Sequence, residues 1–329
     1  MKADRTIGVI GTLVWDRILD RDRRSEPVEE WGGIGYALAA LRSTLPDGWK
    51  VMPILKLGRD LAEDGRHFLN EIPGLSDTGL VVVPEPNNRV ELRYLDRALR
   101  VERLTGGVPS WTWPELAPLV ELCDALYVNF ISGFEMTLET ALALRTVYKR
   151  PTYADLHSLF LSMNQHGQRV PRSLEAWSTW LRCFDAVQMN ENEFDLLSTT
   201  GDPWQLAAGA LGPELKLITV TLGARGAAYV ASDDFDPQPT TWHKHLKVTV
   251  AERARSGKID LEEAPRAGDP TGCGDVWGGT VFARLLAGDE LSEAMRIANH
   301  NAGLNVEHRG ARGLYRHLTG RLSHVEEQV

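Results

Sequence analysis

Short apolar runs recur along the chain at intervals that are typical of an α/β protein. The first run, Thr6 to Val14, is almost continuously apolar, which is the pattern of a strand buried on both faces of a sheet. Helical patterns such as Tyr36 to Leu45 and Leu61 to Glu71 lie between several runs. Strands that alternate with helices predict a mostly parallel sheet covered on both sides. The other predicted strands are Val51 to Leu57, Leu80 to Val83, Ala125 to Phe130, Thr152 to Ala154, Ala186 to Met189 and Leu217 to Leu222, and the other predicted helices are Leu138 to Tyr148, Ser173 to Leu181 and Glu191 to Ser198.

Two segments depart from this alternation. Arg89 to Leu104 alternates apolar and polar residues on both sides of a turn near Asp96 to Ala98, which predicts a hairpin with one solvated face. Trp15 to Gly33 is charged and irregular, and it ends in Gly32-Gly33. We expect these two segments to form a small strand-built lid inserted into the main domain, with the glycine pair at a hinge or a point of close approach.

A third irregular segment, Ser232 to Gly268, is long and polar and contains prolines. Connections of this length without secondary structure are uncommon in compact domains. We therefore expect an exposed loop that contains one strand, at Leu246 to Val250.

Composition limits the class of partner. With 329 residues, of which 43% are hydrophobic, the chain is long enough for one or two domains with a large core. The net charge of −9 argues against a nucleic-acid surface, because phosphate backbones are bound mainly by clustered Lys and Arg. The three cysteines form no C-x-x-C pair, which favours neither a disulfide framework nor a zinc site and suits a reducing cytoplasm. The chain has no apolar run of roughly eighteen residues, so we expect neither a signal peptide nor a membrane span. We expect the partner to be a small molecule.

The segment Asp269-Pro270-Thr271-Gly272-Cys273-Gly274-Asp275 carries the clearest chemistry. Its Gly-Cys-Gly turn leaves room for an approaching group, and the apolar stretch after it, up to about Leu286, predicts a buried helix. The first turn of a helix has free N–H groups and the positive end of the helix dipole, and both attract phosphate. Asp275 adds a carboxylate that can accept a proton, as phosphoryl transfer to a hydroxyl requires. For such a motif alone, the structural alternative is an Asp cap with glycines that close a tight loop.

The D-P-T-G-C-G-D string resembles the D-T-x-G-A-G-D signature of the ribokinase-like, or PfkB, family of carbohydrate and nucleoside kinases. Further segments resemble the family in its order and over nearly the whole chain. The resemblance implies a ribokinase-like three-layer α/β/α fold with a mostly parallel central sheet, as one domain over residues 1–329 with a small β-strand lid at about 15–34 and 88–106. The resembling segments are Gly11 to Asp16, Trp31 to Gly33, Leu57 to Asp60 with Asp64-Gly65, Ile131 to Phe134, Asn190 to Glu193, Thr221 to Gly226, and Ala298 to Val306 with Gly310-Ala311.

The same resemblance implies roles for individual residues. Asp275 would be the general base, and the backbone N–H groups of Gly272, Cys273 and Gly274 would form the anion hole for the γ-phosphoryl group. The other implied roles are nucleotide contacts by Thr221, Gly223 and Gly226, adenine contact by Asn299, Mg²⁺ binding through water by Glu193 with Asn190, substrate contacts by Asp16, Gly32 and Gly33, and support of the loop and of a monovalent cation such as K⁺ by Asp269.

Some of these assignments have structural alternatives. Asn190 and Glu193 stand one helical turn apart and would also form a capping arrangement. Asn299 lies in an apolar helix and would also be a satisfied core amide. The chain departs from the family at the substrate end, where Ala37 replaces a common Asn and the segment Asp155 to Ser158 lacks the Asn and Arg that usually follow the Asp. These departures leave the identity of the acceptor open.

The sequence thus predicts an ATP- and Mg²⁺-dependent kinase that phosphorylates a hydroxyl of a sugar or sugar-like molecule. It contains no G-x-x-x-x-G-K-[ST] motif, so it is not a P-loop enzyme. A nucleoside kinase, and a kinase-like binding or regulatory protein without turnover, stay open as alternatives. A dinucleotide oxidoreductase is disfavoured, because Leu261 to Gly268 does not have the pattern of a buried strand before the glycine turn. An exposed lid sheet also leaves a homodimer open.

Overall fold

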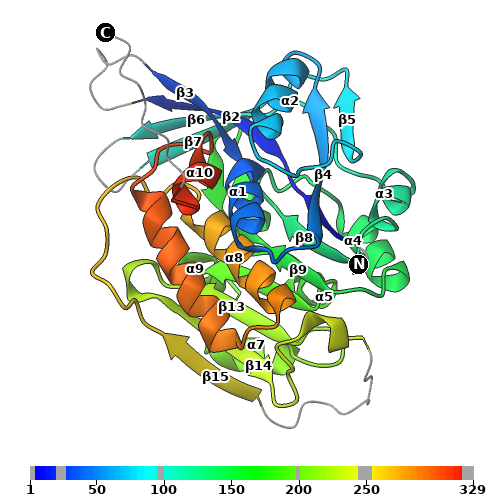
Figure 1. Ribbon diagram of the computed structural model, residues 1–329, viewed down its shortest axis with the longest axis vertical. Coiled ribbons are helices and arrows are strands. Elements are labelled where there is room, and N and C mark those ends of the chain that lie inside the picture. Colours follow the sequence, from blue (N-terminus) through cyan, green and yellow to red (C-terminus); the bar gives the residue numbers. More distant parts are fainter. Residues whose placement is uncertain (1–3, 20–26, 95–99, 198–200, 244–253, 321–329) are drawn as a thin grey trace.

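A nine-stranded sheet forms the middle layer of the protein (Figure 1). The structure is a computed structural model that describes residues 4–19, 27–94, 100–197, 201–243 and 254–320. The seven strands from β13 to β5 are parallel to one another, whereas β14 and β15 are antiparallel additions at one edge. In spatial order the strands are β15 (Ala254–Ile259), β14 (Ala227–Ser232), β13 (Leu217–Thr221), β12 (Ala186–Asn190), β9 (Thr152–Asp155), β8 (Ala125–Asn129), β1 (Arg5–Ile10), β4 (Trp49–Gly58) and β5 (Leu80–Val83).

Helices cover both faces of this sheet, which completes three layers (Figure 1). Alternate residues of each strand enter different cores, because successive side chains of a strand point to opposite faces. In β8, Tyr127 belongs to one buried cluster, while Leu126 and Val128 belong to the other. The first cluster includes residues of α1 (Ile34–Thr44), α2 (Ala62–Asn70), α8 (Cys273–Ala287), α9 (Leu291–Val306) and α10 (Leu314–Leu318), and the second includes residues of α3 (Trp113–Val120), α4 (Leu138–Val147), α5 (Trp177–Arg182), α6 (Glu191–Asp195) and α7 (Pro203–Ala210).

A separate four-stranded sheet stands beside the main layer, in the order β3-β2-β6-β7 (Figure 1). Its strands are β2 (Leu13–Leu19), β3 (Val28–Gly33), β6 (Arg89–Tyr94) and β7 (Arg100–Thr105). The antiparallel pairing of β6 with β7 confirms the hairpin predicted from the period-two pattern. The turn predicted near Asp96 to Ala98 lies outside the described residues. The division into a single domain with a lid stays a prediction.

A two-stranded hairpin connects this small sheet to the main layer. It consists of β10 (Leu161–Met163) and β11 (Arg169–Pro171), and it follows the 3₁₀ helix η1 (His157–Phe160). The Leu104 N–H of β7 donates to the Gly167 carbonyl at 3.3 Å. The hairpin therefore contacts both the small sheet and the carboxyl end of β9.

The structure corrects three of the predicted elements. The run from Thr6 to Val14 is two strands, because the chain breaks at Gly11-Thr12, where the Thr12 carbonyl accepts the N–H of Ile34. The helix predicted at Ser173 begins only at Trp177, after Ala176 in a left-handed conformation. The polar segment after Ser232 contains an edge strand, β15, whose largely exposed side chains give no apolar signal. The strand predicted at Leu246 to Val250 lies outside the described residues.

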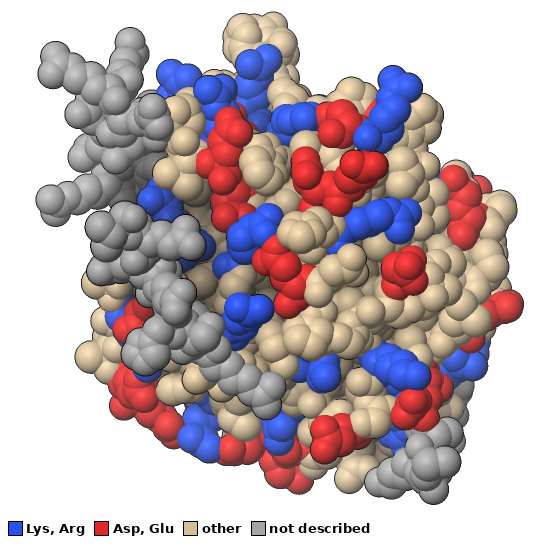
Figure 2. All heavy atoms as spheres, turned by 45° about the horizontal axis from the view of Figure 1, so that its top comes forward, with Lys and Arg blue, Asp and Glu red and all other residues tan. Residues whose placement is uncertain are grey.

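Charges are mixed over the surface. Figure 2 shows acidic and basic side chains interspersed on the face that it presents. Exposed ion pairs such as Arg89 with Asp60, at 2.6 Å, contribute to this mixture. Within the described ranges, none of the helices combines the length and the apolar character that crossing a bilayer requires.

Candidate active site

The carboxyl ends of four adjacent parallel strands bring polar side chains to one edge of the main sheet. Asn129, Asp155, Asn190 and Thr221 are the last residues of β8, β9, β12 and β13. Open α/β sheets bind ligands at this edge. The first turn of α8 lies over it, because the Gln188 side chain of β12 donates to the Gly274 carbonyl at 2.9 Å.

Two cavities share the first turn of α8 as a wall. The larger has a volume of about 470 Å³ and includes Cys273 and Gly274 in its lining. The smaller has a volume of about 100 Å³ and includes Gly272 and Asp275. Consecutive residues of one turn thus face different cavities, and a group that passed from one cavity to the other would cross this turn.

The backbone of this turn needs glycine at position 272. Gly272 has a φ of 79°, in the left-handed region, and a Cβ atom on it would lie 2.3 Å from the Tyr36 ring. The Cys273 N–H donates to the Pro270 carbonyl at 3.1 Å, so this member of the predicted anion hole already has a partner. The Cys273 thiol is held by Asn305, and burial raises its pKa to about 11, which does not suit a nucleophile.

Asp275 lies in the first turn of α8 and is half-buried. Its Oδ1 atom accepts a hydrogen bond of 2.6 Å from Nδ2 of Asn129. Burial raises the pKa of Asp275 to about 6, although the nearby His157 and the Asn129 hydrogen bond both oppose this shift. A carboxylate with a pKa in this range can accept a proton near neutral pH.

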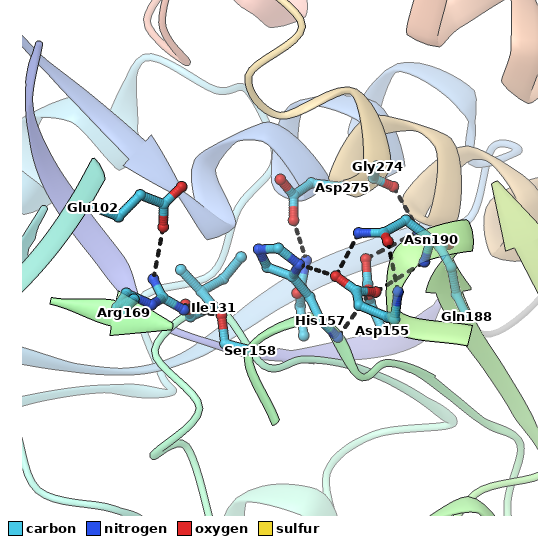
Figure 3. Close-up of polar contacts among 12 residues, drawn as sticks. Glu102, Ile131, Asp155, His157, Ser158, Arg169, Gln188, Asn190, Gly274 and Asp275 are labelled. Atoms are coloured by element: carbon cyan, nitrogen blue, oxygen red, sulfur yellow. Dashed lines mark hydrogen bonds and ion pairs between the residues drawn. The ribbon is translucent and has the colours of Figure 1, made fainter. Parts of the chain in front are cut away.

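His157 lies between Asp275 and the start of α6 (Figure 3). Its Nδ1 atom is 2.6 Å from Oε1 of Glu193. Burial disfavours the charged imidazole, but the carboxylates of Glu193 and Asp155 outweigh burial and raise the pKa of His157 to about 9. The site therefore contains a cationic ring among three carboxyl groups.

Glu193 and Asn190 form a capping box at the start of α6. The Asn190 side chain accepts the Glu193 N–H at 3.0 Å, and Oε2 of Glu193 accepts the Asn190 N–H at 2.8 Å. The pair therefore adopts the capping arrangement that its sequence spacing allows. The Glu193 carboxylate also contacts Nδ1 of His157, so a residue of the cap still interacts with the group beside Asp275.

Asp155 is a buried carboxyl group beneath the turn. It accepts a hydrogen bond of 3.0 Å from Nε2 of Gln188. Burial, with the charges of Asp275 and Glu193, raises the pKa of Asp155 well above its usual range. The Asp155 carboxyl group therefore tends to keep its proton, and a bound cation would favour its ionised form.

These carboxylates fit a magnesium ion that is bound mainly through water. Among the described residues, no group of three or more His, Cys, Asp and Glu side chains is arranged to hold a metal directly. Mg²⁺ usually binds through one or two carboxylates together with waters and substrate phosphates. Glu193 and Asp155, beside the α8 turn, supply such carboxylates.

The smaller cavity lies between this edge and the small sheet. Its lining includes Asp16 and Gly33 from the small sheet, with Tyr36 from α1. Gly32 is not in the lining, but it contacts the Asp16 carboxyl closely enough that a Cβ atom on it would be 1.9 Å from Oδ2. Gly33 adopts a φ of 61° at the start of α1. The structure thus brings the three predicted substrate residues together.

Arg169 of β11 also lines the smaller cavity, with Glu102 of β7 (Figure 3). Nη2 of Arg169 donates to the Ile131 carbonyl at 2.9 Å and to the Ser158 hydroxyl. Nη1 lies 3.8 Å from Oε2 of Glu102. A charged pair from two different sheets therefore forms one wall of this cavity.

The larger cavity contains the segment predicted to bind the nucleotide. Thr221, Gly223 and Gly226 all line it. Asn299 lines it too, but its amide accepts from Nε1 of Trp277 at 2.8 Å and donates to the Ile259 carbonyl at 3.3 Å. The amide of Asn299 is thus satisfied within the protein, and its contact with adenine stays a prediction.

Asp269 stands at the start of the loop that leads to α8. Its Oδ1 atom accepts hydrogen bonds from the N–H and the hydroxyl of Thr271, at 2.9 and 2.7 Å. These bonds support the predicted structural role. Its role at a monovalent cation stays a prediction.

Several residues of the site escaped the sequence analysis. Asn129 lies at the end of an apolar run, and Gln188 lies inside one, so neither is marked by a motif. His157 was seen only as a departure from the family pattern. Arg169 and Glu102 come from polar hairpins, where a charged residue gives no signal. Periodicity could not reveal that these side chains meet.

The comparisons with known proteins agree with this geometry. The model of the pfkB family carbohydrate kinases matches residues 144–317. A nucleoside kinase from Burkholderia thailandensis, in complex with inosine, has a similar structure, with a TM-score of 0.70 and 17% identity over 96% of this chain and 97% of that chain. A putative ribokinase II from E. coli, in complex with ATP and Mg²⁺, has a TM-score of 0.69 and 17% identity over 97% of this chain and 100% of that chain.

A third similar structure is a sulfate complex of a pyrophosphate-dependent kinase in the ribokinase family, with a TM-score of 0.67 and 20% identity over 92% of this chain and 96% of that chain. At these identities the likeness is one of fold, and it confirms the predicted three-layer ribokinase-like architecture. No curated protein sequence matches the chain. Because the family model covers more than half of the chain, the protein belongs to the pfkB family of carbohydrate kinases, which transfer a phosphoryl group to an alcohol.

Proposed function

We propose that the protein phosphorylates a hydroxyl group of a sugar or a nucleoside with ATP as the donor and Asp275 as the general base. The observation that carries this proposal is the first turn of α8, which lines a large cavity with Cys273 and Gly274 and a small one with Asp275. The larger cavity would hold the donor and the smaller one the acceptor.

Asp275 would act on the acceptor hydroxyl. It removes the proton while the hydroxyl oxygen forms a bond to the γ-phosphorus and the bond to the leaving ADP oxygen breaks. Its raised pKa, about 6, matches this task near neutral pH. The amides of Gly272 and Gly274 at the start of α8 would stabilise the charge on the phosphoryl group in transfer, since the positive end of the helix dipole lies there, whereas the Cys273 N–H already donates to the Pro270 carbonyl.

Glu193, Asn190 and Asp155 would hold Mg²⁺ through its water shell beside this turn. When bound, the ion neutralises charge on the donor phosphates. These residues would fix the position of the ion, because the capping box holds Asn190 and Glu193 at the start of α6. A monovalent cation near Asp269 is a further part of the proposal.

The size and lining of the larger cavity favour a nucleotide as donor. A volume of about 470 Å³ exceeds what a pyrophosphate needs, and apolar residues such as Leu261, Ala302 and Val306 suit the faces of a purine ring. The similar E. coli structure was obtained with ATP and Mg²⁺, whereas another similar kinase uses pyrophosphate. Comparing ATP with pyrophosphate as donor tests this choice.

The small sheet would serve as the lid of a single domain. Its residues Asp16, Val90, Leu92 and Glu102 line the acceptor cavity, so closure would exclude water from the reacting groups. The edge strand β3, whose Trp31 carbonyl already accepts the Ala311 N–H, would also suit pairing with a second copy of the chain through its remaining residues. Dimerisation and a cytoplasmic location stay predictions.

The Asp275→Asn variant tests the central assignment. We expect turnover to fall by about 10²- to 10⁴-fold, because the amide cannot accept the proton, while nucleotide affinity stays nearly unchanged. ADP release from Mg·ATP with a panel of sugars and nucleosides measures turnover, and titration with nucleotide measures binding. The exposed Asp77→Asn variant is the control.

Two outcomes would contradict the proposal. Full activity of the Asp275→Asn variant would show that Asp275 is not the general base. Tight ligand binding by the unmodified protein, without turnover of any acceptor, would favour a kinase-like binding protein.

A further inference from the structure

Asn129 connects the centre of the main sheet to the reacting carboxyl group. It is the last residue of β8, and its side chain is fully buried. Its Nδ2 atom donates to Oδ1 of Asp275 at 2.6 Å, across 146 positions of the sequence. The β8 strand is held on both sides by parallel neighbours, β1 and β9, so the position of this donor is fixed by the sheet.

The orientation of this amide follows from its neighbour. An ionised carboxylate only accepts hydrogen bonds, so it selects the NH₂ side of the amide. The Oδ1 atom of Asn129 then points elsewhere, and among the described residues it has no hydrogen-bond partner. Leaving a buried amide oxygen unpaired is unfavourable. The Asn129 side chain therefore donates to Asp275 even though its own Oδ1 atom has no hydrogen-bond partner among the described residues.

The hydrogen bond also distinguishes the two oxygens of Asp275. Oδ1 is occupied by the amide, and in Figure 3 the other oxygen of Asp275 points away from this bond. If Asp275 took up a proton on Oδ1, its new O–H group would face the Asn129 N–H, and two donors cannot bond each other. The hydrogen bond to Asn129 would then be lost. Oδ2 is thus the oxygen that can receive a proton without breaking the contact.

We propose that Asn129 is a positioning residue for Asp275, which holds the carboxyl group in its ionised form and directs the acceptor proton to Oδ2. The proposal rests on the proposed role of Asp275 as general base. In the transfer, the acceptor O–H bond breaks and an Oδ2–H bond forms, while the Asn129 hydrogen bond to Oδ1 stays in place.

Several groups near Asp275 change its pKa, and Asn129 is an uncharged hydrogen-bond donor among them. Burial and the carboxylate of Glu193 raise the pKa of Asp275, whereas His157 and Asn129 lower it. The titratable and charged groups around the carboxyl are His157 of η1, Glu193 of α6, Asp155 of β9, Tyr127 of β8, Tyr36 of α1, Asp269 of the loop before α8, Cys273 of the first turn of α8, Asp16 of β2, Glu102 of β7 and Arg169 of β11.

Two variants test the proposal through the pH dependence of kcat/KM for the acceptor. Asn129→Ala removes the donor, so the acid limb of the profile should move to higher pH by about one to two units, the effect of losing a hydrogen bond to a charged group. Asn129→Asp keeps the size of the side chain and places a second carboxyl group against Asp275. Its acid limb should move further in the same direction, because two adjacent carboxyl groups share a proton. If the alanine variant does not fold, the shift of the acid limb in the aspartate variant tests the proposal alone.

Thr152→Val is the matched control. Thr152 is also buried in the main sheet, at the start of β9, and its hydroxyl donates to Asp185 at 2.9 Å, away from Asp275. We expect this variant to lose thermal stability without a shift of the acid limb. Nucleotide affinity should be unchanged in all three variants.

The possible outcomes separate the two proposals. An unmoved acid limb in both Asn129 variants, with a loss of kcat/KM that follows the loss of thermal stability as in Thr152→Val, would overturn the role of Asn129 and leave Asp275 as the base. An Asp275→Asn variant with full activity would instead overturn the proposed function itself.

Discussion

The Asp16 carboxyl group packs against the bare backbone of Gly32, and a Cβ atom on Gly32 would lie 1.9 Å from Oδ2 of Asp16. The two residues belong to the neighbouring antiparallel strands β2 and β3. Asp16 is buried and lines the smaller cavity. The absence of a side chain at position 32 therefore sets where this carboxyl group can lie in the cavity.

Replacing Gly32 with alanine should weaken use of the acceptor and spare the nucleotide. The new methyl group would displace the Asp16 carboxyl, and a displacement of about 1 Å in a binding group can lower kcat/KM by up to about 10²-fold. Steady-state kinetics with varied acceptor would measure this loss, and nucleotide titration should show an unchanged Kd. Gly209→Ala in α7 is the control, because a Cβ atom there meets nothing within 4 Å. An acceptor KM equal to that of the unmodified protein would show that Asp16 does not contact the acceptor.

Gly226 and Gly223, which both line the larger cavity, offer a matched pair of substitutions. Both have positive φ, 80° and 57°, so alanine is strained at either position. A Cβ atom at Gly226 would lie 2.0 Å from the Ile259 carbonyl oxygen, whereas one at Gly223 meets nothing within 4 Å. We expect Gly226→Ala to raise the nucleotide Kd more than Gly223→Ala, because it must move β15 and the cavity wall behind it. If titration with ATP gave an equal rise in Kd for both variants, the strained backbone conformation alone would account for the loss of affinity.

The activity should depend on pH through Asp275. Burial raises its pKa to about 6, and a general base works only when it is ionised. Below about pH 6 the carboxyl group is protonated, so kcat/KM should rise with pH through this value and then level off. A profile that stays flat from pH 5 to about pH 7 would argue that another group takes the proton.

A buried carboxylate at the other end of the main sheet should control stability. Asp185 is 0% exposed and accepts from Arg145 at 2.8 Å and from the Thr152 N–H at 2.9 Å. Burial would raise its pKa, but His243 and Arg145 outweigh burial and lower the pKa below its usual value. A carboxyl group with a lowered folded-state pKa stabilises the fold above the pKa of the unfolded chain, and this contribution disappears as the pH falls through the folded-state value.

The Asp185→Asn variant should therefore lose about 3–5 kcal/mol of unfolding free energy at pH 7, as expected when one partner of a buried ion pair is removed. Urea unfolding measures the difference, which should shrink as the pH falls below about 4. Exposed Asp77→Asn serves again as the control. A difference that does not change with pH would show that the ionised form of Asp185 adds nothing to stability.

Much of the architecture could be predicted from the sequence, because the inner strands of the main sheet, such as β8 and β9, are buried on both faces. The run from Leu80 to Val83 predicted the edge strand β5 residue by residue, because its residues are all apolar, although Val81 and Val82 are exposed. β15 could not be predicted in this way, since an edge strand with exposed side chains has neither a continuous apolar run nor a clear alternation. The helix after Gly272 was predicted correctly because its small and apolar residues pack against α1 and α9.

The site was predictable only where one motif holds its residues together. Gly272 and Asp275 lie within one turn, and the distance between them in space follows from the sequence. Asn129 and Asp275 are 146 positions apart, and only the order of strands in the sheet brings them into contact. Arg169 depends on a short polar hairpin whose position no periodic pattern records. Such long-range pairs require the tertiary structure.

The two cavities that meet at the α8 turn have a stereochemical consequence. With a nucleotide in one and an alcohol in the other, the leaving oxygen of the nucleotide and the attacking oxygen of the alcohol would lie on opposite sides of the phosphorus atom. The Cys273 thiol at the boundary does not suit an intermediate carrier, because burial raises its pKa to about 11. This placement predicts a single displacement with inversion of configuration at phosphorus.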